Sequence, residues 1–336
     1  KEYWAPGAFC SRSNVCSLWS AIMVFAGMEG ECLQHGDSWW KEKVGLGRSL
    51  GCSVMSFLQA IIIAILQGAT ELFPVSSLGH AVILPALLHW SYDLHDVSFL
   101  PFLVMLHLGT SVALLIFFWK DWTALFHGAS GALGKRLQIE SLHIFFLLVV
   151  ATIPAVIVGA LFEHMLRSFF GSAVSAAIFL FLNGLMLLLA EKLRGMSGRH
   201  GVRTVADMTM VDALVVGCFQ CIAFFPGFSR SGATICGGLL RGLQHDTAAR
   251  FSFLMAEPVI LAATVREAFK MRGMPLDAGQ IRIAIVAAIV SGIVALASTA
   301  FLMRYFRNHD KWALSPFAYY CMALGAIATV VFHFAA

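Results

Sequence analysis

Long apolar runs separated by short polar loops make up most of the chain after Met55. A helix needs about 20 residues to cross the hydrocarbon core of a bilayer. The apolar runs of this length predict spanning helices at approximately 99–119, 142–162, 173–190, 250–268, 281–303 and 314–334. The pattern therefore predicts an all-α integral membrane protein with six transmembrane helices.

Two further apolar segments are interrupted near their middle by proline, glycine and serine. Residues 56–90 contain ELFPVSSLGH at 71–80, and residues 212–242 contain FFPGFSRSG at 224–232. Each half is too short to cross a bilayer as a helix. Backbone that leaves the helix at membrane depth must be buried in protein or line a watery cavity, because lipid offers no hydrogen-bond partner. We therefore predict two re-entrant helical hairpins that face the protein interior.

The order of these elements predicts an internal repeat. Each interrupted segment is followed by three spans, so the second unit starts on the opposite side of the membrane and the two units form an inverted-topology repeat. The units cover about 55–190 and 212–336. Twelve Lys and Arg residues fall in loops on one predicted side and five on the other, which places the basic side in the cytoplasm. The first hairpin then enters from the outer face and the second from the inner face.

Composition agrees with a membrane protein and excludes other classes. Of the 336 residues, 59% are hydrophobic and 12% are charged, whereas soluble proteins carry about 25% charged residues. This excludes a cytosolic enzyme, a coiled coil and a disordered chain, and the net charge of +4 is too small to indicate nucleic-acid binding. Residues 1–54 have a different character and are treated as an N-terminal extension of unknown status, with 55–336 as the membrane domain. Trp119, Trp122 and Trp312 stand near span ends and fit an interfacial belt.

Polar residues at the first interruption carry candidate chemistry. A charge at membrane depth costs at least about 2.5–3.5 kcal/mol, so function is the default interpretation of such a residue. Gln67 and Glu71 are four residues apart and lie on one helix face. Ser77 and His80 would share a face if a helix restarts after the proline, which would bring a hydroxyl close to a candidate base. Ser76, next to that proline, is a predicted N-cap.

The second interruption has the residue types of a phosphate site. Arg230 carries a guanidinium that can bind two oxygens at once, and the glycines and the new helix N-terminus offer backbone N–H groups. The hydroxyls predicted to bind phosphate with Arg230 belong to Ser229, Ser231, Thr234 and Ser76. Glu71 could instead pair with Arg230 and do nothing more, but that alternative leaves the hydroxyls, the glycines and His80 unexplained.

The two motifs together resemble the undecaprenyl pyrophosphate phosphatase family, the BacA-type bacitracin-resistance proteins. The similarity rests on LQGATELFPVSSLGH at 66–80 and FFPGFSRSGATI at 224–235, and it covers essentially all of 55–336. The resemblance implies a phosphatase of the bacterial inner membrane whose substrate is a polyprenyl pyrophosphate lipid. Such an enzyme converts undecaprenyl pyrophosphate to the monophosphate and inorganic phosphate, which recycles the carrier for peptidoglycan synthesis and confers bacitracin resistance.

The resemblance also implies a site that opens toward the outer face and requires a divalent cation, Mg²⁺ or Ca²⁺. Its residues are Gln67, Glu71, Ser77, His80 and Arg230, with Glu71 and Gln67 as the metal ligands. Family members carry Glu or Gln at the position of Gln67. Glu257 departs from the family pattern, since that position is usually small or apolar. We interpret Glu257 as a local ion-pair partner in preference to an additional residue of the site.

Several alternatives stay open at the level of sequence. Ser77 is the favoured nucleophile and His80 the group that takes its proton or protonates the leaving phosphate, but a water nucleophile is the alternative. Glu71 either holds the metal or orients His80. For His107 and His143, an interhelical hydrogen bond is the preferred interpretation and a catalytic role is the alternative. A secondary transporter or lipid flippase is the rival function, because inverted repeats with broken helices are also its signature. A homodimer is neither required nor excluded.

Overall fold

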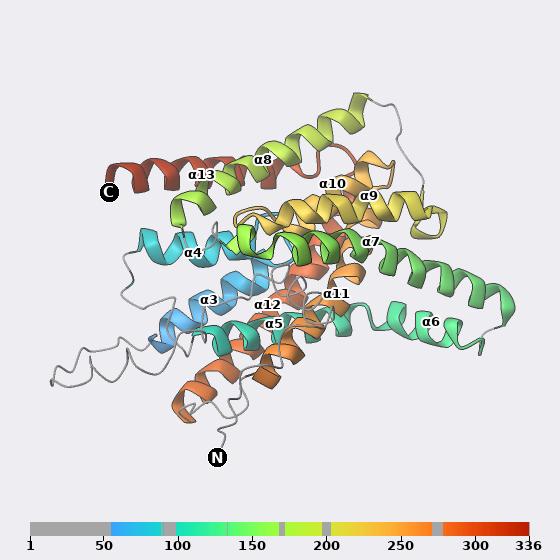
Figure 1. Ribbon diagram of the computed structural model, residues 1–336, viewed down its shortest axis with the longest axis horizontal. Helices are drawn as coiled ribbons and strands as arrows, with labels where there is room; N and C mark the ends of the chain where they lie inside the picture. Colours follow the sequence, from blue (N-terminus) through green and yellow to red (C-terminus); the bar gives the residue numbers. More distant parts are fainter. Residues whose placement is uncertain are drawn as a thin grey trace, which may run out of the picture.

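The computed structural model describes residues 55–88, 90, 99–132, 134–167, 172–196, 203–270 and 278–335. Within these ranges every regular element is a helix (Figure 1). The predicted all-α class is therefore confirmed for the described chain. The predicted N-terminal extension, residues 1–54, lies outside the described residues.

The first interrupted segment forms two short helices, α3 (Phe57–Thr70) and α4 (Ser77–Leu87). Ser56 and Gln59 make a capping box at the start of α3, in which each side chain accepts a hydrogen bond from the other residue's backbone N–H. Pro74 follows the end of α3 and restricts the residue before it to extended backbone, so the helix cannot continue. The hydroxyl of Ser76 accepts the N–H of Gly79 at 3.2 Å, which confirms Ser76 as the N-cap of α4.

The second interrupted segment contains α9 (Met210–Gln220), the short 3-10 helix η2 (Cys221–Phe224) and α10 (Arg230–Leu240). Ser229 caps α10 by accepting the N–H of Gly232 at 3.1 Å. Gly227 lies in the break with φ +111, a backbone conformation open to glycine. A Cβ at Gly227 would also come within 2.4 Å of the carbonyl oxygen of Ala176 in α8. Both predicted interruptions are therefore confirmed as breaks between short helices.

The other helices are longer, apart from α6 and η1. They are α5 (Phe99–Phe117), α6 (Trp119–Ala129), α7 (Lys135–Arg167), α8 (Ala173–Met196), η1 (Val205–Asp207), α11 (His245–Lys270), α12 (Ala278–Asn308) and α13 (Ser315–Ala335). Among the described residues, α7, α8, α12 and α13 are long and apolar enough to cross a membrane, and the pair α5–α6, bent by 69°, makes a fifth candidate if it is one span. A helix lies at each of the six predicted spans, but α11 falls outside this set of candidates. A multi-pass membrane protein follows from the four or five candidates.

Helix packing brings the two broken segments into the interior. In Figure 1, α8 and α13 run side by side along one edge of the molecule, and α5 and α12 pack together toward the opposite edge. The breaks after α3 and α9 come together between these pairs, beside α8. Glycine allows the closest approaches: a Cβ on Gly109 of α5 would lie 2.1 Å from the carbonyl oxygen of Ala288 in α12.

Gly109→Ala is expected to destabilise the fold by about 1–3 kcal/mol, because the added methyl overlaps a backbone carbonyl that moves only if α5 and α12 separate. The measurement is the thermal unfolding temperature of the purified protein in detergent. Gly195→Ala on α8 is the matched control, since a Cβ there meets nothing within 4 Å and alanine is the better helix former by up to about 1 kcal/mol. Equal melting temperatures for the two variants would contradict the packing argument.

Candidate active site

One buried side chain, Asn183 of α8, joins the two helix breaks. Its amide nitrogen donates to the carbonyl oxygen of Pro74 at 3.0 Å, and its amide oxygen accepts the backbone N–H of Ser229 at 3.0 Å. Asn183 is fully buried. It therefore satisfies a carbonyl and an N–H that the broken helices leave without a helical partner. Sequence reasoning missed this residue, although an asparagine in the middle of the apolar run IFLFLNGLMLLL was a signal for it.

Hydroxyl groups of the second break reinforce the junction. Ser231 donates to the carbonyl oxygen of Phe73 at 2.9 Å, and the hydroxyl of Ser229 lies 3.3 Å from the same oxygen. Thr234 bonds to the carbonyl oxygen of Arg230 at 2.9 Å and to the hydroxyl of Ser252 at 2.7 Å. Ser229 and Ser231 therefore hold one break against the other, whereas Thr234 joins α10 to α11.

The four hydroxyls predicted to bind phosphate thus all have partners inside the protein. Ser229, Ser231 and Thr234 bond across or within the second break, and Ser76 caps α4. A hydroxyl that already donates to a carbonyl must exchange that bond to donate to a ligand. Phosphate binding by these four residues stays a prediction.

Glu71, the residue after α3, receives hydrogen bonds from three side chains. Its Oε1 accepts from Nη2 of Arg230 at 3.0 Å. Its Oε2 accepts from the hydroxyl of Ser77 at 2.6 Å and from the amide nitrogen of Gln67 at 3.1 Å. The pair Glu71–Arg230 joins positions 159 residues apart in the sequence. The two motifs, which the resemblance implies to share one site, are therefore in direct contact.

The Glu71–Arg230 pair is nearly enclosed, since the two side chains are only 9% and 12% exposed. Two charges taken out of water lose much of their hydration, so their attraction yields little net stability, whereas losing one partner costs about 3–5 kcal/mol. A buried pair is therefore weak evidence for a purely stabilising role. The short bond from Ser77 to the same carboxylate adds a hydroxyl whose proton Glu71 is placed to accept.

The turn between α3 and α4 sets the direction of Ser77. Ser76 has φ 65 and ψ 102, which lies in the left-handed region that residues other than glycine rarely adopt. Such backbone costs of order 1–3 kcal/mol and persists where the surrounding structure fixes it, often at functional sites. Here it starts α4 so that the Ser77 hydroxyl faces the end of α3.

The imidazole of His80 is engaged away from Ser77. Its Nδ1 lies 2.6 Å from the carbonyl oxygen of Ser76, and its Nε2 lies 2.8 Å from the hydroxyl of Tyr320 in α13. The ring also stacks on Tyr320, with 5.6 Å between the ring centroids. The partner of the Ser77 hydroxyl is therefore Glu71, and proton transfer by His80 stays a prediction. The bond to Ser76 does give His80 a place in fixing the strained turn.

Two further ionisable residues of α5 and α11 border the site. Nε2 of His107 is 3.9 Å from Oε2 of Glu71, while its Nδ1 lies 2.9 Å from the carbonyl oxygen of Leu103 in the same helix. Glu257 is 2% exposed and accepts the hydroxyl of Ser111 at 2.6 Å.

The structure bears differently on the roles predicted for Glu257, His107 and His143. Glu257 forms no ion pair within 4.0 Å among the described residues, so the predicted local pair is wrong there, although its charge attracts that of Arg230. The interhelical hydrogen bond predicted for His107 is not found among the described residues, because its Nδ1 bonds within α5 and its Nε2 is too far from Glu71 for a hydrogen bond. His143, for which the same bond was predicted, lies 2.9 Å from the carbonyl oxygen of Met208, which belongs to the connection between η1 and α9, so its partner is outside a helix.

The donor set around Glu71 bears on a divalent cation. Among the described residues, no three or more His, Cys, Asp or Glu side chains are grouped so that they could hold a metal. Mg²⁺, however, is commonly bound by one or two carboxylates together with substrate phosphates and water. Both oxygens of Glu71 accept hydrogen bonds, one of them from the amide nitrogen of Gln67, so a cation held by these two residues together with a phosphorylated ligand stays a prediction.

Comparison with known proteins identifies relatives of the whole membrane domain. Residues 60–327 match the family described as bacitracin resistance protein BacA. A protein named undecaprenyl-diphosphatase from Gluconacetobacter diazotrophicus is 62% identical over 274 residues, which cover 82% of this chain and 96% of the relative. Proteins of the same name from Granulibacter bethesdensis and Gluconobacter oxydans are 56% and 54% identical, over 84% and 82% of this chain and 98% and 99% of their own lengths.

Asn183→Leu is expected to lower the melting temperature, because the carbonyl of Pro74 and the N–H of Ser229 lose a buried partner, at about 1–3 kcal/mol for each unsatisfied group. Thermal unfolding in detergent measures the effect. Leu185→Ala on the same helix is the control, since that side chain is 41% exposed. An Asn183→Leu variant as stable as the control would show that the junction does not depend on this side chain.

Proposed function

Because the chain belongs to the family of the bacitracin resistance protein BacA, we propose that it hydrolyses undecaprenyl diphosphate to undecaprenyl phosphate and inorganic phosphate. The observation that carries the proposal is the contact chain from Arg230 through Glu71 to Ser77. It combines a cation for phosphate oxygens, a carboxylate base and a hydroxyl nucleophile in one buried place. The product would return the lipid carrier to peptidoglycan synthesis, and that recycling would account for bacitracin resistance.

The geometry supports a two-step phosphoryl transfer. The Ser77 oxygen attacks the terminal phosphorus as its proton passes to Oε2 of Glu71. The bond from that phosphorus to the bridging oxygen breaks, and undecaprenyl phosphate leaves with the electron pair and takes up the proton. Water then attacks the phosphoserine, Glu71 accepts a proton from the water, and the same proton returns to the Ser77 oxygen as inorganic phosphate is released. Arg230 binds the oxygens of the phosphoryl group, on which negative charge must be stabilised.

A divalent cation would act on the same diphosphate. Glu71 and Gln67 would hold it, and its charge would help neutralise the phosphate oxygens in the transfer. His80 would keep the Ser76 turn in place and present Ser77, with its ring held by Tyr320.

We also propose six membrane-spanning helices and two re-entrant hairpins in an inverted repeat. In such a repeat each helix of the first unit corresponds to one of the second: α3 to α9, α4 to α10, α5 to α11, α7 to α12 and α8 to α13. The contact between α3 and α12 then corresponds to the contact between α9 and α7. The contact of α8 with α10 has its counterpart in α13 with α4. All four contacts occur, together with the self-related pairs α8–α13 and α5–α11. In this arrangement the protein lies in the bacterial inner membrane with its site opening toward the outer face.

The rival function is transport or flipping of a lipid, which the paired contacts of an inverted repeat favour equally. The two functions separate in one assay. A phosphatase releases phosphate from undecaprenyl diphosphate in detergent, where no second compartment exists. A transporter moves its substrate between compartments and leaves the phosphate bond intact.

Arg230→Ala is expected to reduce phosphate release about 10²- to 10³-fold, as loss of one group that stabilises transition-state charge does in other enzymes. Arg304→Ala, at an exposed position of α12, is the control and is expected to keep wild-type activity. Because Arg230→Ala leaves Glu71 buried without its partner, Arg230→Lys is measured beside it, with the melting temperature of each. Activity within threefold of wild type in a folded Arg230→Ala protein would rule out the proposed role.

Removal of divalent cations with a chelator is expected to lower phosphate release at least tenfold, and addition of Mg²⁺ or Ca²⁺ is expected to restore it. A cation held partly by the substrate must be taken up from solution with it. Gln67→Glu adds a second carboxylate and is expected to lower the Mg²⁺ concentration for half-maximal activity several-fold. Full activity in excess chelator, with no response to Gln67→Glu, would contradict a metal at these residues.

A further inference from the structure

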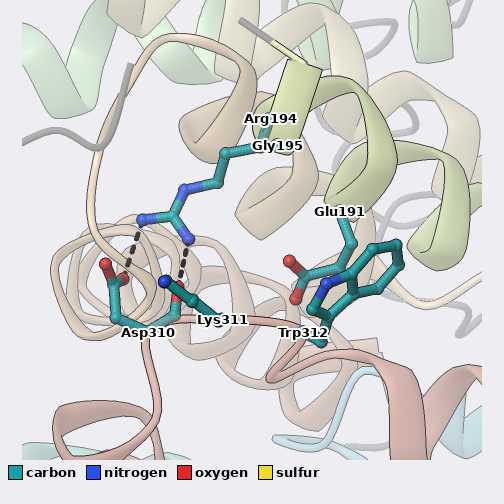
Figure 2. Close-up of a pocket in the computed structure, with 6 residues that line it drawn as sticks. All are labelled: Glu191, Arg194, Gly195, Asp310, Lys311 and Trp312. Atoms are coloured by element: carbon teal, nitrogen blue, oxygen red, sulfur yellow. Dashed lines mark hydrogen bonds and ion pairs between the residues drawn. The ribbon is translucent and has the colours of Figure 1, made fainter. Parts of the chain in front are cut away.

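A separate pocket lies at the end of α8, eight residues beyond Asn183 and so about 12 Å along the helix from the junction of the two breaks. It has a volume of about 190 Å³ and lies between the last turns of α8 and the connection from α12 to α13 (Figure 2). The residues that line it are Glu191, Arg194, Gly195, Asp310, Lys311 and Trp312. Because α8, α12 and α13 are candidate spans that end or begin here, the pocket lies at a membrane–water boundary.

The deepest acidic group of the pocket is Glu191. Its Oε1 accepts the backbone N–H of Leu314 at 2.8 Å and lies 2.8 Å from Nε2 of His245. Its Oε2 has no hydrogen bond to any described residue, although the side chain is only 3% exposed. Figure 2 shows this carboxylate turned into the cavity, between Lys311 and Trp312. Because Oε2 accepts no hydrogen bond from the described residues, it is available to a ligand that brings N–H groups or positive charge.

A second ion pair holds one wall of the pocket in place. Arg194, itself 3% exposed, donates from Nη1 to the backbone oxygen of Asp310 at 2.5 Å and from Nη2 to its carboxylate at 2.7 Å. Burial acts to raise the pKa of the Asp310 carboxyl, but hydrogen bonds from Arg194 and His245 outweigh it and hold the pKa below its usual value. The pair therefore stays ionised at neutral pH, and the guanidinium is committed to the wall.

The mouth of the pocket carries an ammonium group and an indole. Lys311 is exposed and forms no ion pair with the described residues. Trp312 is 54% exposed and has φ 56, a backbone conformation kept only where its surroundings fix it. An indole face attracts a cation within about 6 Å of the ring centre. The pocket is therefore acidic and aromatic inside and basic at its rim.

We propose that this pocket binds a zwitterion made of a primary ammonium and a phosphodiester, the chemistry of a phosphatidylethanolamine headgroup. The ammonium donates to Oε2 of Glu191 against the indole of Trp312, and the phosphate meets Lys311 at the rim. At about 190 Å³ the cavity is much larger than a single-water site, which leaves room for an aminoethyl phosphodiester group. This site is independent of the phosphatase reaction. The same chemistry has two sources, the lipid headgroup and soluble glycerophosphoethanolamine.

The test is native mass spectrometry of the full chain, purified in detergent and given phosphatidylethanolamine, phosphatidylcholine or phosphatidylglycerol with the same acyl chains. One phosphatidylethanolamine is expected to bind at least tenfold more tightly than the other two lipids. The trimethylated headgroup has no N–H for Glu191, and the glycerol headgroup has no cation. Equal binding of the three lipids would overturn the proposal.

Variants locate the site. Lys311→Ala removes the contact to the phosphate that all three lipids share and is expected to weaken the binding of all three. Trp312→Ala removes the indole beside the ammonium and is expected to reduce the preference over phosphatidylglycerol. Lys192→Ala, an exposed lysine of α8 outside the pocket, is expected to change neither. Glu191→Gln removes the negative charge at the deepest position. Its melting temperature is measured together with lipid binding, because Oε1 also accepts the N–H of Leu314 and the substitution can affect the fold. Unchanged binding of phosphatidylethanolamine in both rim variants would overturn the proposal. Displacement of the lipid by soluble glycerophosphoethanolamine at equal concentration would identify the soluble source, and its failure to displace would identify the lipid.

Discussion

The ion pair between Arg230 and Glu71 is the interaction on which the arrangement of the site depends. Each charge is held in a region from which water is largely excluded, and each would be costly without the other. The pair therefore requires the break after α3 and the break before α10 to stay together, although they are far apart in the sequence. The bonds of Asn183, Ser229 and Ser231 to the backbone of the opposite break serve the same end.

This arrangement divides the polar groups between two tasks. The hydroxyls that bond to backbone carbonyls replace hydrogen bonds that broken helices cannot make for themselves in a membrane. Ser77 differs, because its hydroxyl donates to a carboxylate that can take its proton. Glu71 thus links the cation that would hold a phosphate to the hydroxyl that would attack it, and the strained backbone of Ser76 fixes that link.

Much of this could be predicted from the sequence, because the bilayer leaves few choices. The length of apolar runs predicted where helices lie, and proline and glycine predicted where two of them break. The cost of a charge at membrane depth singled out Glu71 and Arg230 as functional, and the resemblance implied that they share one site. The spacing of Ser77 and His80 could not predict that His80 bonds to Tyr320. Spacing shows which residues share a helix face, but it does not show which other helix packs against that face. The positive φ of Ser76, the bend between α5 and α6 and the bonds of Asn183 likewise arise from tertiary contacts.

The central claim is that Ser77, activated by Glu71 beside Arg230, attacks the terminal phosphate. The most direct test is a single-turnover reaction with undecaprenyl diphosphate labelled in its terminal phosphate, quenched in acid and analysed by peptide mass spectrometry. The account predicts a phosphate on Ser77 that appears and decays at rates compatible with turnover. Release of labelled phosphate at the normal rate with no phosphoserine at any time, or undiminished release by Ser77→Ala, would contradict it and favour direct attack by water.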